Sequence, residues 1–187
     1  MNLYLRLLWT LLRGHWLAAL RLDATLIQHW RVLPNDLDIN QHMNNGRYLT
    51  MVDLGLMEFF TRSGFLKSLL AQGWRPMAGG VQMSFRRDLK LFQRYELHFR
   101  WLCSDERWNY MAVEFIRHGV VHAAGMMRGG AVGRDGIVPT SRYDEHFPEA
   151  GRAELATMLA RPLTADVLAW RESDRALMQR VKGERAA

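Results

Sequence analysis

Six polar residues that could do chemistry fall within ten consecutive positions of the sequence. They are Asp36, Asp38, Asn40, His42, Asn44 and Asn45. A carboxylate can act as a nucleophile or a general base, and a nearby histidine can orient a carboxylate or a reacting carbonyl group. So dense a group of these residue types indicates a functional site rather than a simple connecting loop.

The segments on either side predict a strand before this group and a helix after it. Residues 25–33 are β-prone and roughly alternating, whereas apolar residues recur at helical spacing through residues 48–60. The polar group therefore lies where a helix begins, and the first backbone N–H groups of a helix have no partner inside it. These groups and the positive end of the helix dipole can stabilise an oxygen that gains negative charge.

The motif D-x-D-x-x-x-H-M-N-N-x-R-Y-L, preceded by RVLP, resembles the thioesterases of the hot-dog fold. It is most similar to the thioesterase superfamily member six group, and more distantly to 4-hydroxybenzoyl-CoA thioesterase and the long-chain acyl-CoA thioesterases. The resemblance covers residues 31–138, and residues 168–179 are similar to the C-terminus of that group. It implies an α+β hot-dog fold, in which an antiparallel sheet of about five strands wraps around a central helix.

The resemblance also implies a division of roles within the motif. Asp38 falls on the family's catalytic aspartate and would act as a nucleophile or a general base. The backbone N–H of Asn45 would stabilise the oxyanion, with Gly46 beside it. For His42 two interpretations stay open, orientation of the carboxylate or carbonyl group and a hydrogen-bonded place in the junction. Asn44 or Asn45 is expected to cap the helix.

Asp36 has two interpretations as well. It could share a proton with Asp38 or position His42. Alternatively, residues 34–36 form a turn in which Asp36 accepts hydrogen bonds from backbone N–H groups. We favour the turn, because short acidic side chains commonly take that role.

We expect substrate contacts both within the motif and along a later strand. Two adjacent glycines there allow close approach of a backbone, and two arginines at the strand end either bind the phosphates of coenzyme A or form a solvated edge. The expected substrate-binding residues are Asn44, Gly46, Tyr48, Gly79, Gly80, Arg86 and Arg87. Coenzyme A is here part of the substrate, and neither a separate cofactor nor a metal is expected.

Length and composition predict an ordinary globular protein with a sizeable core. The 187 residues are 49% hydrophobic and 24% charged. The single cysteine, Cys103, gives no disulfide and no zinc-site spacing, which favours a reducing, cytoplasmic location. The formal charge of +6 would suit nucleic acid, a membrane or an anionic ligand. Because the basic residues are scattered and accompany no nucleic-acid motif, we expect coenzyme A or lipid and no nucleic acid.

Three parts are expected along the chain: an amphipathic helix over 1–22, a hot-dog thioesterase domain over 23–138 and a helical extension over 139–187. Within them we expect helices at residues 45–63, 65–72, 149–159 and 164–182 and further strands at 78–89, 95–104, 108–117 and 120–132. The resemblance implies a homo-oligomer, either a dimer or a tetramer, in which sheets pair edge to edge.

The first 22 residues predict a helix with a narrow polar stripe, formed by Asn2, Arg6, Thr10 and Arg13, and a wide apolar face. The arginines interrupt it too often for a membrane span, which needs about 20 apolar residues. The helix either lies in a membrane surface, with its arginines toward lipid phosphate, or packs on its own protein or a partner subunit. The first choice would place the protein at the periphery of the inner membrane.

The resulting expectation is an acyl-CoA thioesterase that acts on a fatty-acyl or aromatic acyl-CoA. An acyl-binding or lipid-binding hot-dog protein without turnover, peripheral to a membrane, is the alternative. An enoyl-CoA hydratase type of enzyme ranks behind both, since that branch has the pattern D-x-N-P-x-H. Here the spacing from Asp38 to His42 is one residue shorter, and the proline is absent.

Overall fold

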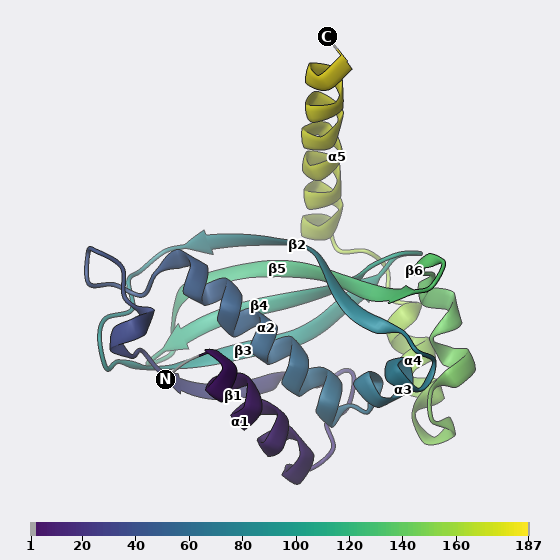
Figure 1. Ribbon diagram of the computed structural model, residues 1–187, viewed down its shortest axis with the longest axis horizontal. Helices are drawn as coiled ribbons and strands as arrows, with labels where there is room; N and C mark the ends of the chain where they lie inside the picture. The colour runs from purple at the N-terminus through teal and green to yellow at the C-terminus, as the bar shows by residue number, and fades with distance from the viewer. Residues whose placement is uncertain (1–2, 187) are drawn as a thin grey trace.

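The computed structural model describes residues 3–186 as a curled antiparallel sheet with helices on both faces (Figure 1). The strand order is β1-β3-β4-β5-β2, and a short sixth strand pairs with β5. The strands are β1 (Leu26–Arg31), β2 (Arg75–Phe85), β3 (Arg94–Ser104), β4 (Asn109–Arg117), β5 (Val120–Gly133) and β6 (Gly136–Val138). The first and second strands of the chain thus form the two edges.

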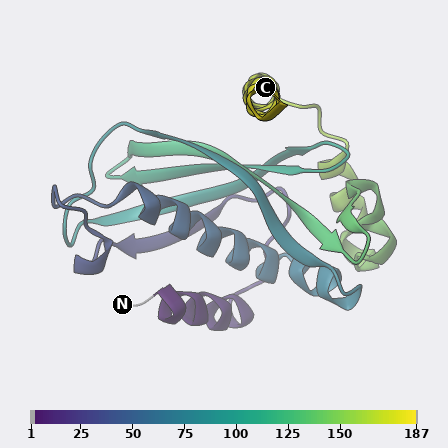
Figure 2. The same ribbon diagram turned by 45° about the horizontal axis from the view of Figure 1, so that its top comes forward.

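The helices are divided between the two faces of the sheet. The central helix α2 (Asn45–Arg62) runs across the inner face of the sheet. Helix α1 (Leu3–Trp16) packs on α2. At one end follow α3 (Phe65–Ala71) and α4 (Glu149–Leu159), whereas α5 (Ala165–Ala186) lies on the opposite side of the sheet from α1 and α2 (Figure 2). This arrangement confirms the predicted α+β layout of a sheet wrapped around a central helix.

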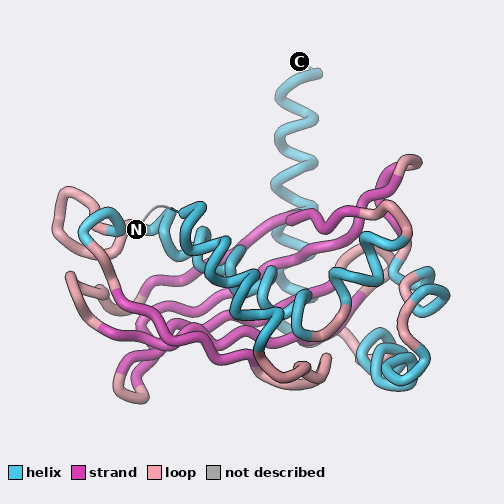
Figure 3. Tube along the Cα trace, turned by 60° about the horizontal axis from the view of Figure 1, so that its bottom comes forward, coloured by secondary structure: helices cyan, strands magenta, loops and turns pink. Residues whose placement is uncertain are grey.

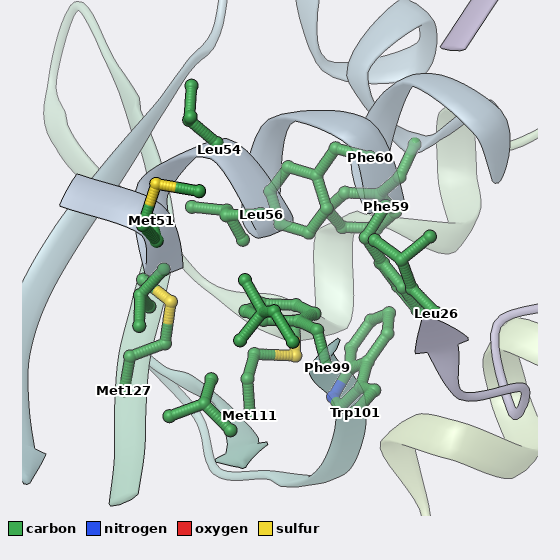
Figure 4. Packing of buried hydrophobic residues seen from close by; sticks show 14 of the residues in the cluster. Leu26, Met51, Leu54, Leu56, Phe59, Phe60, Phe99, Trp101, Met111 and Met127 are labelled. Carbon is green, nitrogen blue, oxygen red and sulfur yellow. The ribbon is translucent and has the colours of Figure 1, made fainter. Parts of the chain in front are cut away.

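The core lies between α2 and the inner face of the sheet (Figure 4). Phe59 of α2 packs against Phe99 of β3 with ring centroids 5.7 Å apart, and both are fully buried. Helix and sheet approach closely at Gly55, where an added Cβ would lie 3.2 Å from the Phe99 ring. Burial of these large apolar side chains drives the packing of α2 on the sheet.

Most predicted elements are confirmed, and the differences have local causes. The second strand ends at Phe85 instead of residue 89, because Met43 donates its N–H to the carbonyl of Leu89 and His42 bridges to Lys90. The short strand β6 was not expected. The first helix ends at Trp16 instead of residue 22, and Met1, Asn2 and Ala187 lie outside the described residues, including the predicted place of Asn2 on the polar stripe.

Helix α1 packs with its polar stripe toward the protein. Arg6 and Thr10 are buried, and Gly14 lies against Thr61 of α2. The exposed residues are instead the large apolar ones, namely Tyr4, Leu5, Leu8, Trp9, Leu12 and Trp16. The expectation that Arg6 points toward lipid phosphate is therefore wrong. No helix within residues 3–186 has the length and apolar character that crossing a membrane requires.

Arg6 turns inward because a buried carboxylate meets it there. Its Nη1 and Nη2 donate to the two carboxylate oxygens of Asp36 at 2.9 and 2.6 Å, and the side chains are 3% and 1% exposed. Asp36 also accepts the N–H of Leu33, and its backbone carbonyl accepts the N–H of Asn44. The turn interpretation of Asp36 is confirmed, and this single residue joins α1, the 3-10 helix Pro34–Asp36 and the residue that precedes α2.

We expect Asp36→Asn to lower the free energy of unfolding by about 3 kcal/mol or more, because the substitution leaves Arg6 charged and buried without a counter-ion. Urea denaturation followed by circular dichroism measures this loss. The matched control is Asp23→Asn, which breaks an ion pair with Arg21 in which the side chains are 37% and 72% exposed. The control should lower the free energy of unfolding far less, because solvent screens an exposed ion pair. Equal losses for the two variants would contradict the role assigned to the buried pair.

Candidate active site

The polar motif folds into a tight loop at one end of the sheet, away from α3 and α4 (Figure 3). The N–H of Asp38 donates to the carbonyl of His42 at 2.8 Å, and the N–H of Gln41 donates to the carbonyl of Asp38. Gln41 adopts a φ of 60°, in the left-handed region, which closes the turn. The loop then leads directly into α2.

The two carboxylate oxygens of Asp38 differ in their surroundings. Its Oδ1 accepts the backbone N–H groups of Asn40 at 2.9 Å and His42 at 3.2 Å. Within residues 3–186, no group donates a hydrogen bond to Oδ2. The side chain is half-buried. One oxygen therefore fixes the orientation of the carboxylate, and the other is left for a ligand or water.

The N-terminus of α2 leaves one backbone N–H group unused. Asn44 caps the helix as predicted, since its Oδ1 accepts the N–H of Gly46 at 2.8 Å. This bond occupies the N–H of Gly46. That group is therefore not free to act as the second oxyanion donor that we expected beside Asn45. The N–H of Asn45 has no acceptor in the part of the chain that the structure describes. It is exposed at the positive end of the helix dipole.

His42 pairs with an aspartate other than Asp38. Its Nε2 lies 3.2 Å from Oδ2 of Asp88, and Nζ of Lys90 lies 3.6 Å from the same oxygen. Hydrogen bonding from its own backbone N–H, and then the charges of Lys90 and His42, hold the pKa of Asp88 below its usual range. The sequence pattern did not indicate Asp88, because the two segments meet only through tertiary contacts, namely the β-bridge between His42 and Lys90 and the bond from Met43 to Leu89.

Tyr48 lies beneath the loop in the core. Its ring packs edge-to-face on Phe85 and Phe115, with centroids 5.1 and 4.7 Å away. Burial, followed by the charge of Asp88, raises the pKa of Tyr48 to about 12. The hydroxyl therefore stays protonated at neutral pH, and the residue fastens the first turn of α2 to β2 and β4. Its contact with substrate stays a prediction.

The two glycines of β2 lie beside tryptophans of the protein itself. A Cβ at Gly79 would come within 2.4 Å of Trp108, and one at Gly80 within 3.4 Å of Trp170. The close approach that glycine permits is thus filled by these indole rings. This packing does not support a role of Gly79 and Gly80 in binding substrate, and that role stays a prediction.

Arg86 and Arg87 line different hollows. Arg87 belongs to a groove of about 540 Å³ whose walls include Asp88 and Lys90. Asp88 is the ion-pair partner of His42. The remaining wall residues of this groove are Gln93, Arg117, His118, Val120 and His122. Arg86 belongs to a separate hollow on the outer face of the sheet. Only Arg87 therefore lies in the basic groove beside the motif.

The largest hollow is an open groove of about 1100 Å³ at the ends of β1, β3 and β4. It shares Gln93, Arg117 and His118 with the basic groove and includes Trp9 of α1. Asp38 forms no part of the wall of either groove. Among residues 3–186, no cluster of three or more His, Cys, Asp or Glu side chains is arranged to hold a metal ion.

Comparison with known proteins identifies relatives of this chain. Residues 32–167 match the family described as the thioesterase-like superfamily. Protein THEM6 of Xenopus laevis is 36% identical over 104 residues, which are 54% of this chain and 50% of that protein. The chain therefore spans about half the length of this curated relative.

Solved structures share the fold at low sequence identity. The probable thioesterase YbaW of Escherichia coli is 15% identical, with a TM-score of 0.61 over 72% of this chain and 98% of that chain. The protein SAV2348 of Staphylococcus aureus, solved in complex with CoA, is 12% identical, with a TM-score of 0.58 over 79% and 92%. The family match covers well over half of the sequence and agrees with the strand order and the motif, so this chain belongs to the thioesterase-like superfamily and has its hot-dog fold.

Proposed function

We propose that this protein hydrolyses a fatty-acyl or aromatic acyl-CoA thioester, with Asp38 as the nucleophile or general base. The single observation that carries the proposal is the difference in hydrogen bonding between the two carboxylate oxygens of Asp38. Two backbone N–H groups fix Oδ1, whereas Oδ2 has no partner within residues 3–186. A pre-oriented carboxylate with a free oxygen beside a helix N-terminus suits attack on a carbonyl group.

Two routes use the same groups. In the first, Oδ2 attacks the thioester carbon, the C–S bond breaks with release of the thiolate, and water hydrolyses the acyl anhydride. In the second, Oδ2 takes a proton from a water molecule that attacks the thioester carbon, and the C–S bond then breaks with release of the thiolate, which takes up the proton. Either way, negative charge develops on the carbonyl oxygen, and the free N–H of Asn45 with the α2 dipole can stabilise it.

The basic groove is the proposed place for the phosphates of coenzyme A. Arg87, Lys90 and Arg117 line it, and the Nε of Arg117 is buried without a partner among the described residues. Asp88, which lies in its wall, is the ion-pair partner of His42 in the motif. Guanidinium groups bind phosphate oxygens well, so the groove offers charge complementary to the nucleotide end of the substrate.

A homodimer is part of the proposal. Among residues 3–186, strand β2 pairs with β5 alone and leaves its other edge open. Neither groove reaches Asp38 within one chain, so a second subunit joined at this edge would supply the missing wall of the acyl channel.

We further propose that the exposed face of α1 rests on the cytoplasmic surface of a membrane. Trp9 and Trp16 are exposed on this face, and Trp9 also lines the groove that contains Arg31, Arg94 and Arg117. Apolar residues beside cations favour the interface of an anionic bilayer. Such a contact would bring the site close to lipid-soluble acyl groups.

We expect Asp38→Asn to reduce thiol release from acyl-CoA at least about a hundredfold, because it removes the nucleophile or base. The asparagine side-chain oxygen can still accept from Asn40 and His42, so the melting temperature should change little. A thiol-trapping assay over a panel of acyl chain lengths measures turnover. Asp135→Asn, in the exposed turn before β6, is the control and should keep full activity.

Two outcomes of that assay would count against the proposal. Near-normal turnover by the Asp38→Asn variant would move the chemistry to another residue. Saturable binding of acyl-CoA by the native protein without any thiol release would favour the alternative, an acyl-binding protein without catalysis.

We expect Trp9→Ser/Trp16→Ser to weaken co-sedimentation with phosphatidylglycerol vesicles at least about tenfold, because two exposed indole rings no longer enter the interface. Added salt should weaken binding of the native protein, since it screens the arginine contribution. Ile27→Ser/Leu70→Ser is the control, because both residues are exposed apolar side chains outside α1. Equal pelleting of the two double variants would contradict membrane contact through α1.

A further inference from the structure

The first half of α5 is anchored on the outer face of the sheet. Val167 is buried beside Cys103 and Tyr110 in a small second core. Trp170 packs edge-to-face on Tyr110, with ring centroids 6.1 Å apart. The guanidinium group of Arg128 lies 5.4 Å from the Trp170 ring and forms an ion pair with Asp174, with Nη2 2.9 Å from Oδ2. The position of α5 relative to β4 and β5 is therefore well defined as far as Asp174.

The second half of α5 leaves the body of the protein. The helix passes the β2 edge and continues away from the other strands (Figure 1), and Figure 3 shows the same projection from another side. Within residues 175–184 the only ion pair joins Arg180 to Glu184 of the same helix. This half of the helix thus makes no polar contact with the rest of the described chain.

The face of α5 that packs on the sheet continues as an apolar stripe beyond the edge of the sheet. Val167, Trp170 and Asp174 follow one another at helical spacing along this face. The same spacing continues through Leu177, Met178 and Val181, of which the first two are exposed. The exposed apolar residues lie on the same helix face as the residues that pack on the sheet. We therefore expect them to pack on a surface that continues the outer face of the sheet.

The β2 edge supplies such a continuation only if a second copy is present. Strand β2 has 11 residues whose outward N–H and C=O groups face no strand. Two copies related by a two-fold axis can pair these strands antiparallel and extend the sheet under the projecting helix. At about 1.5 Å per residue, the part of α5 beyond Asp174 spans roughly 18 Å, the width of between about three and four strands.

The outer face next to β2 also offers a place for the stripe. A hollow of about 360 Å³ opens there, and its lining combines the small residues Ala112, Ala124 and Gly125 and Met126 with polar and charged side chains that include Arg86, Arg100, Glu114 and Asp166. Small residues let a helix approach a sheet closely. In a two-fold dimer the hollow of each copy lies on the side of the edge toward which the α5 helix of the other copy points.

We propose that α5 is a strap that crosses the β2 edge and packs Leu177, Met178 and Val181 into the outer-face hollow of a second copy of this chain. The inference rests on the homodimer that belongs to the proposed function, and it adds the element that locks the two copies together. Each subunit gives one strap and receives one, so the contact occurs twice in the dimer.

Sedimentation equilibrium of the full-length protein tests the strap. Leu177→Ser/Met178→Ser should raise the dimer dissociation constant at least about tenfold, because the substitutions remove four buried apolar side chains per dimer from the contact. The control is Ala176→Ser/Gln179→Ser, on the opposite face of α5, which should leave the constant unchanged. Equal dissociation constants for the two variants, or a native protein that stays monomeric at micromolar concentration, would overturn the proposal.

A cross-linking experiment reads the location of the contact directly. Chains carrying Met178→Cys are mixed with chains carrying Ala124→Cys and treated with a short bis-maleimide. The expected product is a covalent dimer that contains one chain of each kind, and no such product should form from either variant alone. A dimer without this cross-link would overturn the strap. Thiol release by the same samples distinguishes failure of the strap from failure of the enzymatic proposal, because neither substitution lies at Asp38.

Discussion

The buried ion pair of Arg6 and Asp36 is the interaction on which the candidate site depends. Both side chains are almost completely removed from water, and each charge would be strongly unfavourable there without the other. Asp36 also accepts the N–H of Leu33 and gives its carbonyl to Asn44. The pair therefore ties the N-terminal helix to both ends of the segment that carries Asp38.

This constraint explains the unusual orientation of α1. A helix with a narrow polar stripe normally turns that stripe toward water. Here the stripe holds Arg6, which finds a bidentate carboxylate partner inside, and Gly14 beside the stripe allows close packing on α2. The apolar residues consequently remain on the outside. Such a face is unfavourable in water, and this is the reason for the proposed contact with a lipid bilayer.

The site itself separates structural from chemical roles within single residues. One oxygen of Asp38 holds the loop, and the other stays unpaired among the described residues. Asn44 occupies the N–H of Gly46 and thereby leaves the N–H of Asn45 as the free donor at the helix start. Basic side chains line the neighbouring groove, whose wall includes Asp88, the partner of His42. The carboxylate, the free backbone N–H and the cations thus lie at the same end of the fold.

The sequence by itself determined the local features of this protein. The strand, loop and helix order around Asp38, the cap at Asn44 and the turn at Asp36 all follow from residues close to one another along the chain. Hydrophobic periodicity likewise predicted the helices at residues 45–63 and 149–159, because helical and strand patterns repeat over short distances. The motif was sufficient to indicate the family.

Only the tertiary structure decided which distant residues meet. Arg6 is 30 positions from Asp36, and nothing in the sequence distinguishes it from Arg13 as the buried arginine. His42 pairs with Asp88 through a β-bridge, and Trp108 and Trp170 fill the space beside Gly79 and Gly80. The outward apolar face of α1 and the projection of α5 past the β2 edge are equally invisible in periodicity. A periodic pattern shows that a helix has two faces, but the partner that packs against it determines which face is buried.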